Sequence, residues 1–243
     1  MRVVMLGTGY VGLVSGVCFS DFGHDVVCVD KDPKKIEKLL NGEIPIFEPG
    51  LDRLLEQNVK EGRLSFTLDL DDAAKDADAV FIAVGTPTRR GDGGADLQYV
   101  FAAAEEIANT FPDGVTVVLK STVPVGTNRA VRDHIRKTNP DFEFYMASNP
   151  EFLREGAAIE DFMRPDRVVV GCDSEQAEHV LRRLYRPLYL RETPMLFTTF
   201  ETAEIVKYAA NAFLATKITF INEIADLCEK VDADVQQVAK GIG

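Results

Sequence analysis

Residues 3–30 read VVMLGTGYVGLVSGVCFSDFGHDVVCVD, and this stretch decides the fold. An apolar run is followed by Gly7, Gly9 and Gly12, a helix-patterned segment, a second apolar run and then Asp30. In a dinucleotide-binding βαβ unit the first glycine allows a tight turn and the second lets the backbone approach a pyrophosphate. The third glycine allows close packing of helix on strand. The order of these features predicts such a unit here.

The start of the predicted helix and the acidic residue after the second strand indicate the ligand. Free N–H groups and the dipole at the helix start, around Tyr10 and Val11, stabilise phosphate charge without a basic side chain. Asp30 stands near the spacing expected of a carboxylate that accepts hydrogen bonds from ribose hydroxyls. Such a carboxylate repels a 2′-phosphate, which favours NAD over NADP, although the neighbouring Lys31 works against this preference.

Composition narrows the class of protein. The chain has 243 residues, of which 46% are hydrophobic and 27% charged, enough for one large domain or one and a part. Its formal net charge of −12 argues against a nucleic-acid surface, which needs clustered Lys and Arg. No further apolar run is long enough to predict a membrane span. The four cysteines lack metal-ligand spacing, so no metal site is expected, and they suggest reduced thiols in the cytoplasm.

Strand-like runs alternate with helix-patterned segments, which is typical of an α/β, Rossmann-like, doubly wound parallel sheet. A short helix is expected to start near Pro49–Gly50, and a glycine-rich turn at Arg89–Gly94. The predicted strands are Arg2–Leu6, Asp25–Val29, Leu64–Thr67, Ala79–Val84, Thr116–Leu119, Phe142–Ala147, Arg167–Val170 and Met195–Thr198.

The pattern changes after Thr199. Residues Glu201–Val231 contain no proline or glycine and carry apolar residues at helical spacing, which predicts one long amphipathic helix. We therefore expect a nucleotide-binding domain over residues 1–199. Residues 200–243 would form a connecting helix and the start of a second, helical domain through which two copies pair. The sequence also suggests the front part of a longer protein.

Residues directly after a strand face the ligand crevice of such a sheet. Thr86, in Gly85-Thr86-Pro87, and Thr122, in the segment Lys120–Thr127, are placed to contact a cofactor or substrate, and Thr127 is placed to cap the next helix. For these positions an ordinary turn with a capping hydroxyl is an equal alternative.

Two further segments carry charged side chains at helical spacing. Pro150 at a first helical position would place Glu151 and Glu155 on one face of a short helix, where a solvated face is the alternative. Lys207 and Asn211 are four residues apart on the long helix. A half-buried lysine has a lowered pKa and can hold an oxyanion, although a lysine at the edge of an apolar stripe more often extends its charge into water.

Taken together, the motifs closely resemble the UDP-glucose/GDP-mannose dehydrogenase family over essentially the whole chain. Within it, NPEFLREG and PDRVVVG are most similar to the branch that acts on UDP-glucose. The motifs are GTGYVG at residues 7–12, EPGL at 48–51, VGTP at 84–87, KSTVPVGT at 120–127, NPEFLREG at 149–156, PDRVVVG at 165–171 and EIVKYAANAFLATKITFINEIA at 204–225.

The resemblance implies two NAD-dependent oxidations at the sugar C6, through a cysteine-bound thioester. It implies that Lys207 and Asn211 stabilise the oxyanion, that Glu151 assists proton transfer in thioester hydrolysis, and that Thr122 stands at the junction of cofactor and substrate. The residues implied to hold NAD are Gly7, Gly9, Tyr10, Val11, Gly12, Asp30, Lys35, Thr86, Thr122 and Glu155. Those implied to hold the sugar nucleotide are Glu151, Phe152, Leu153, Arg154, Glu155, Lys207 and Asn211.

The family's thiol nucleophile and its second nucleotide-binding domain lie beyond the point where this sequence ends. None of Cys18, Cys28, Cys172 and Cys228 is a credible substitute, so we expect these 243 residues to bind NAD without completing the oxidation. Alternatives are a dehydrogenase of GDP-mannose or UDP-N-acetylmannosamine, a β-hydroxyacid dehydrogenase, which should lack NPEFLREG, and a non-catalytic NAD-binding module.

Overall fold

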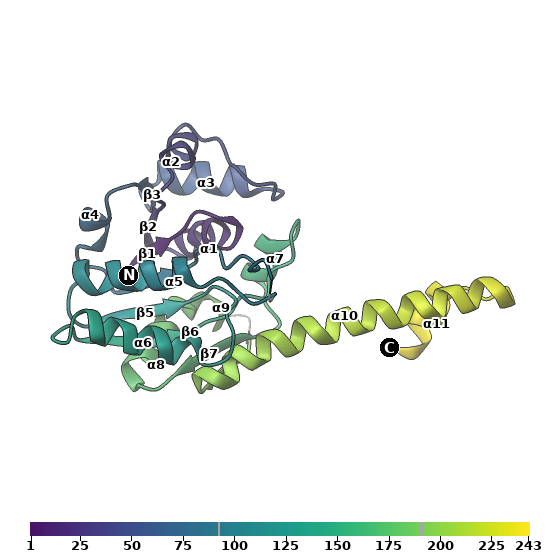
Figure 1. Cartoon of the computed structure of the whole chain (residues 1–243). Coiled ribbons are helices and arrows are strands. Elements are labelled where there is room, and N and C mark those ends of the chain that lie inside the picture. Colours follow the sequence, from purple (N-terminus) through teal and green to yellow (C-terminus); the bar gives the residue numbers. More distant parts are fainter. Residues whose placement is uncertain (92, 190–191) are drawn as a thin grey trace. The chain divides into compact units, whose positions relative to one another are not determined.

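A mixed sheet organises the first part of the chain in the computed structural model, which describes residues 1–91, 93–189 and 192–243. Residues Met1–Glu204 form one unit and Ile205–Gly243 a second. Within the described residues the sheet has eight strands in the order β3-β2-β1-β4-β5-β6-β7-β8 (Figure 1). The strands are β1 (Arg2–Leu6), β2 (Asp25–Val29), β3 (Leu64–Thr67), β4 (Ala79–Ile82), β5 (Val115–Leu119), β6 (Phe144–Ser148), β7 (Val168–Cys172) and β8 (Met195–Thr198).

Every predicted strand is present, with ends that differ by at most two residues from the prediction. The parallel arrangement holds from β3 to β6 and again between β7 and β8, but β6 and β7 pair antiparallel. The predicted Rossmann-like, doubly wound parallel sheet is therefore confirmed, with this one antiparallel pair as the difference. The connection between them holds only the short helix α7 (Ala158–Met163), whereas a parallel crossover normally needs a longer helix that returns along the sheet.

Helices cover both faces of the sheet, as the alternating pattern predicts. On one face α1, α3, α7 and α8 share a core with Val3, Met5 and Phe81; on the other, α4, α5 and α6 pack on Val4 and Ile82. Strand side chains alternate between these two cores because successive residues of a strand point to opposite faces. The helices of the first unit are α1 (Tyr10–Asp21), α2 (Pro33–Leu40), α3 (Leu51–Lys60), α4 (Leu70–Ala74), α5 (Gln98–Thr110), α6 (Thr127–Thr138), α7, α8 (Glu175–Leu184) and α9 (Arg186–Tyr189).

An aromatic cluster fixes α1 to the sheet and to α7. The Phe19 ring lies 5.2 Å from the ring of Phe81 and 5.0 Å from that of Phe162, between ring centroids. Tyr185 adds a third contact at 5.3 Å. These separations lie in the range at which aromatic pairs contribute beyond simple area burial.

The long helix predicted over Glu201–Val231 is confirmed as α10 (Phe200–Val231), followed by α11 (Val235–Ile242). The helix predicted near Pro49–Gly50 is α3, which begins after Gly50 in a left-handed conformation (φ 82°). One residue of the turn predicted at Arg89–Gly94, Asp92, lies outside the described residues. None of the described helices combines the length and the apolarity needed to cross a bilayer.

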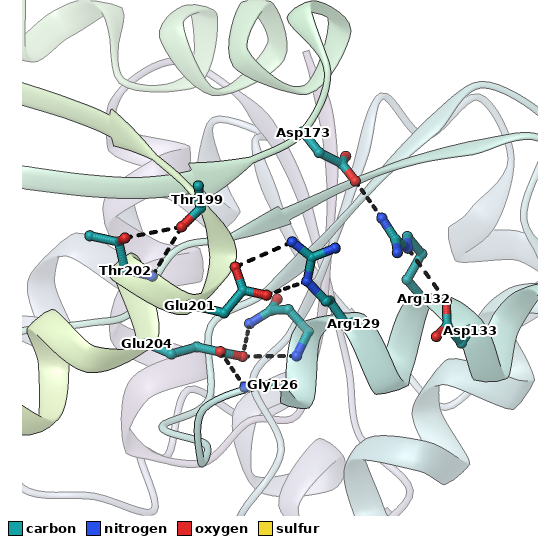
Figure 2. A network of polar contacts seen from close by, with 10 residues as sticks. Gly126, Arg129, Arg132, Asp133, Asp173, Thr199, Glu201, Thr202 and Glu204 are labelled. Carbon is teal, nitrogen blue, oxygen red and sulfur yellow. Dashed lines mark hydrogen bonds and ion pairs between the residues drawn. The ribbon is translucent and has the colours of Figure 1, made fainter.

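The first turn of α10 belongs to the first unit and is held there by polar contacts (Figure 2). The buried Glu204 carboxylate accepts hydrogen bonds from the backbone N–H of Gly126 at 2.7 Å and of Asn128 at 2.8 Å. The predicted cap by Thr127 was wrong, because its hydroxyl donates to the carbonyl of Pro124 and Glu204 occupies the start of α6 instead. Glu201 also pairs with Arg129.

Buried His24 provides a pH-dependent test of this fold. Its ring Nε2 lies 2.9 Å from the carbonyl oxygen of Leu184, at 8% residue exposure. Burial lowers the pKa of His24, and the hydrogen bond to Leu184 opposes this only in part. Because the folded-state pKa lies below that of the unfolded chain, the unfolded state binds more protons below about pH 6.5.

We therefore expect the free energy of unfolding to fall as pH decreases through 6.5, by up to about 1.4 kcal/mol per pH unit from this group. Urea denaturation between pH 7.5 and 5.5 measures this slope, and His24→Gln should flatten it. His179→Gln, which replaces an exposed histidine, is the matched control. Equal slopes in wild type and His24→Gln would contradict the assignment.

Candidate functional site

The glycine turn lies at the point where the strand order reverses, between β1 and β4. Gly7 has φ +100°, and a Cβ placed on it would stand 2.8 Å from the Ala83 carbonyl oxygen. A Cβ on Gly12 would stand 2.0 Å from the Gly7 oxygen, so neither position admits a side chain. A Cβ on Gly9 would meet nothing within 4 Å. The turn therefore needs two of its glycines for its own packing and leaves open space at the third.

The start of α1 is free to bind an anion. Gly9 precedes the helix without a side-chain cap, and no acidic residue occupies its first turn. Leu13 is the first residue whose N–H reaches a helical carbonyl, that of Gly9, so the amides of Tyr10 and Val11 precede the helical ladder. This geometry fits the pyrophosphate of a dinucleotide, as the spacing of the glycines predicts.

A cavity of about 630 Å³ opens beside this turn. Its volume falls within the range of small-molecule sites. The wall includes the glycine turn, the end of β2, the residues after β4 and one face of α5. Lining residues among the predicted cofactor ligands are Gly7, Gly9, Asp30 and Lys35.

Asp30 is fixed at the end of β2 by its own hydrogen bonds. Its Oδ2 accepts from the Thr8 N–H at 2.8 Å and the Thr8 hydroxyl at 2.7 Å, and its Oδ1 accepts from the Asp32 N–H at 3.0 Å. Lys35 Nζ lies 3.5 Å from Oδ2. Burial acts to raise the pKa of Asp30, but these hydrogen bonds and the Lys35 charge outweigh it and lower the pKa. Asp30 is thus an ionised acceptor in the position where a ribose would bind.

Lys31 forms an ion pair with a different carboxylate from the one that Lys35 contacts. It pairs with Glu106 on α5, and both residues line the same cavity. The pairing offsets its positive charge, so Lys31 offers less attraction to a 2′-phosphate than the sequence alone suggests.

The structure brings together two residues that the sequence places at the ends of different strands. The Thr86 hydroxyl donates to the carbonyl oxygen of Thr122 at 3.0 Å. Beside them, the Ser121 hydroxyl donates to the Val84 carbonyl at 2.6 Å. The segments after β4 and β5 are therefore fixed to each other at the carboxyl edge of the sheet.

Residues 151–156 do not form the predicted short helix, so Glu151 and Glu155 do not share a helical face. Their backbone N–H groups bond to side chains instead of helical carbonyls: Leu153 to Glu151 at 2.6 Å, and Arg154 to Asp161 at 2.8 Å. Gly156 has a left-handed conformation, with φ +85°, and regular helix begins only at α7.

The other side chains of this segment have distinct surroundings. Phe152 lies under the guanidinium of Arg167, 4.1 Å from the ring centroid, and Leu153 packs against the core. Arg154 pairs with Asp161, which lowers the pKa of that carboxyl, and the Glu155 residue is exposed. Glu155 is therefore the acidic residue of the segment most open to a ligand.

Sequence reasoning missed two buried charged residues beside these segments. Glu48 accepts hydrogen bonds from Tyr10 and from the backbone that follows Glu155. Lys120, 2% exposed, directly follows β5, and its Nζ lies 3.3 Å from Asn149 Oδ1. The signal for Lys120 was a charged residue directly after a largely apolar, buried strand. The signal for Glu48 was its place in the EPGL motif.

Lys207 and Asn211 lie on α10 in the second unit. Lys207 is buried, 6% exposed, rather than half-buried as expected, and Asn211 is exposed. Their contact with a substrate stays a prediction. The four cysteines are free, and Cys172 alone among them is partly exposed. In the described part of the chain no group of His, Cys, Asp and Glu has the arrangement of a metal site.

The chain is similar to known proteins along its whole length. Residues 1–189 match the NAD binding domain of the UDP-glucose/GDP-mannose dehydrogenase family, and residues 201–243 match the central domain of that family. The UDP-glucose 6-dehydrogenase of Rhizobium meliloti (strain 1021) is 64% identical over 245 residues, which cover 100% of this chain and 56% of that protein. The chain therefore spans little more than half the length of this relative.

Solved structures of UDP-glucose and GDP-mannose dehydrogenases have the same fold as this chain. The UDP-glucose dehydrogenase of Pyrobaculum islandicum superposes with a TM-score of 0.92 at 42% identity, over 99% of this chain and 56% of that one. The GDP-mannose dehydrogenase of Pseudomonas aeruginosa, solved as a ternary complex, gives a TM-score of 0.93 at 39% identity, over 100% and 56%.

The Asp30 geometry predicts the choice of cofactor. If the Asp30 carboxylate accepts hydrogen bonds from ribose hydroxyls and repels a 2′-phosphate, as predicted, Asp30→Asn should lower NAD affinity about tenfold to a hundredfold. Affinity for NADP should rise relative to NAD. Calorimetric titration of both cofactors measures this, with Glu37→Gln on the exposed face of α2 as control. An unchanged ratio of the two dissociation constants would show that Asp30 does not discriminate.

Proposed function

Because this chain belongs to the UDP-glucose/GDP-mannose dehydrogenase family, we propose that the protein oxidises UDP-glucose to UDP-glucuronate with NAD. The observation that carries the proposal is the glycine turn with its adjoining cavity and the fixed Asp30 carboxylate. The 64% identity to a UDP-glucose 6-dehydrogenase supports the choice of sugar nucleotide.

The first unit fits the cofactor. Amides at the start of α1 would bind the pyrophosphate in the space left open at Gly9, and Asp30 with Lys35 would bind the adenosine ribose. Thr86 and Thr122, already joined by a hydrogen bond, would lie toward the nicotinamide end, with Glu155 nearby. NAD supplies the capacity to accept a hydride from the sugar C6.

The resemblance to the family supports the choice of the residues that would act on the substrate. Residues Glu151–Glu155 would line the sugar-nucleotide site, and Glu151 would assist the proton transfer that hydrolyses a thioester. Lys207 and Asn211, one helical turn apart, would stabilise the oxyanion that develops at C6. A buried cation suits this role because water screens its charge less than at the surface.

Other family substrates make a second candidate. The TM-score of 0.93 to a GDP-mannose dehydrogenase supports GDP-mannose as the alternative substrate. UDP-N-acetylmannosamine is a further, less favoured alternative. A β-hydroxyacid dehydrogenase is disfavoured because the chain carries NPEFLREG at residues 149–156. A non-catalytic NAD-binding module would bind cofactor and leave every sugar nucleotide unoxidised.

We divide the chain at residue 200, with a nucleotide-binding domain before it and the start of the central domain after it. Exposed apolar residues on α10, among them Phe213, Leu214 and Ile218, support pairing of two copies through this helix. Free cysteines support a reducing compartment, the cytoplasm.

Residues 1–243, expressed alone, should bind NAD in a calorimetric titration and produce no NADH with UDP-glucose. We expect this because the resemblance implies a thiol nucleophile outside residues 1–243. Cys18, Cys28 and Cys228 are buried, and the partly exposed Cys172 is the last residue of β7. Absorbance at the NADH band measures turnover, with the full-length protein as positive control. NADH production by the 243-residue chain would overturn this prediction.

In the full-length protein, Lys207→Ala should lower kcat by on the order of 10²-fold, because one transition-state cation is lost. Steady-state kinetics with UDP-glucose measures the change. Lys230→Ala, an exposed lysine near the end of the same helix, is the matched control. Unchanged turnover in Lys207→Ala would remove the lysine from the mechanism.

A further inference from the structure

Glu48 is a buried carboxylate in a mostly exposed loop between α2 and α3. Its residue is 7% exposed, whereas the neighbouring Phe47 is 83% exposed. Burying an ionised carboxylate is costly unless hydrogen bonds replace its hydration. The Glu48 carboxylate is therefore expected to accept hydrogen bonds from protein groups that replace its hydration.

Those partners come from two distant parts of the chain. Glu48 Oε2 accepts from the Tyr10 hydroxyl and from the Gly156 N–H at 3.0 Å, and Oε1 accepts from the Ile159 N–H at 3.3 Å. The Tyr10 hydroxyl also lies 3.1 Å from the Gly156 nitrogen and 3.3 Å from the Arg154 carbonyl oxygen. Glu48 and Tyr10 thus form one polar cluster with the backbone of residues 154–159.

Tyr10 remains protonated in this cluster. Burial, and after it the hydrogen bond to Glu48, raises the pKa of Tyr10 to about 12. The hydroxyl is therefore a donor at physiological pH. The Glu48 carboxylate accepts hydrogen bonds from this hydroxyl and from two backbone N–H groups. A carboxylate can accept all three at once because it has two oxygens and no donor of its own.

The two sides of the cluster carry different parts of the proposed site. Tyr10 is the first residue of α1, where the pyrophosphate would bind. Gly156 directly follows Glu155, at the end of the segment that would bind the sugar nucleotide. We propose that Glu48 is a positioning residue that holds the glycine turn and residues 151–156 in one arrangement, so that cofactor and sugar nucleotide meet in reacting geometry. This inference rests on the proposed function.

Three substitutions separate the contacts. Glu48→Ala removes all of them, and Tyr10→Phe removes only the hydroxyl donor. Glu48→Gln retains one carbonyl oxygen for Tyr10 and Gly156 but sets an NH₂ group against the Ile159 N–H, so it should rescue in part. Glu43→Ala removes an exposed carboxylate of the same loop and is the matched control.

The first measurement needs no ligand. Hydrogen exchange of the Gly156 and Ile159 amides in the full-length protein should be about tenfold or more faster in Glu48→Ala than in wild type. Trypsin cleavage after Arg154 should accelerate in parallel. Glu43→Ala should match wild type, and Glu48→Gln should fall between the two.

The second measurement is steady-state kinetics of the full-length protein with NAD and UDP-glucose. Glu48→Ala should raise the KM for both and lower kcat, each by about tenfold or more, with partial rescue by Glu48→Gln. Tyr10→Phe should add little to Glu48→Ala, because the two groups share one contact. A lower yield of folded protein with unchanged KM values would instead mark a purely structural residue and overturn the inference.

The outcomes separate the two proposals. If wild type oxidises UDP-glucose but Glu48→Ala equals Glu43→Ala in exchange and kinetics, the inference is wrong and the proposed function stands. If wild type oxidises no sugar nucleotide, the proposed function fails and the inference fails with it. Should Glu48→Ala not fold, Glu48→Gln and Tyr10→Phe decide the matter, since wild-type KM values in both would refute the positioning role.

Discussion

The contact of Gly12 with the Gly7 carbonyl is the constraint on which the site depends. A Cβ at residue 12 would stand 2.0 Å from that oxygen, so α1 can start directly against the end of β1 only with glycine there. This close start places the beginning of α1 at the switch between β1 and β4, where Gly7 and Gly9 line the cavity. It also places Tyr10 where its hydroxyl reaches Glu48. Binding surface and polar cluster thus follow from one steric condition.

Much of this architecture could be predicted because it depends on local patterns. The inner strands are mostly apolar and buried on both faces, so their positions are evident from the sequence. The long helix follows from the absence of proline and glycine. The glycine spacing and Asp30 likewise indicate a dinucleotide site from residues that lie within the first 30 positions of the sequence. The cavity and the uncapped helix start agree with that interpretation.

What could not be predicted depends on contacts between distant segments. Residues 151–156 carry helical spacing, but their amides bind side chains instead of carbonyls of the same segment, which no local pattern reveals. The antiparallel β7 has the same origin, since the connection before it stays near the carboxyl edge. Thr127 was an apt capping residue by type, yet Glu204, 77 positions later, occupies that place.

Three buried or nearly buried carboxylates accept hydrogen bonds from backbone N–H groups around the carboxyl edge of the sheet. Connections there leave backbone N–H groups without strand partners, and such groups need acceptors. Asp30 accepts from Thr8 and Asp32, Glu48 from residues 156 and 159, and Glu204 from residues 126 and 128. A carboxylate accepts several donors with two oxygens and brings no donor of its own.

The three carboxylates differ in whether a ligand can reach them. Asp30 faces the cavity, so a ligand can share its acceptor capacity. Glu48 and Glu204 are almost fully buried, so their hydrogen bonds are committed to protein groups. Removing Glu204 leaves the N–H groups of Gly126 and Asn128 without this acceptor, and removing Glu48 does the same to Ile159, whereas Gly156 retains the Tyr10 hydroxyl. A buried donor left unsatisfied costs more than its hydrogen bond contributes. Loops that carry function are usually the mobile part of an enzyme. Here Glu48 joins its loop to Tyr10 and to residues 156 and 159, and Glu204 joins the first turn of α10 to the start of α6. Under the proposed function, connections fixed in this way would help to position cofactor and sugar nucleotide.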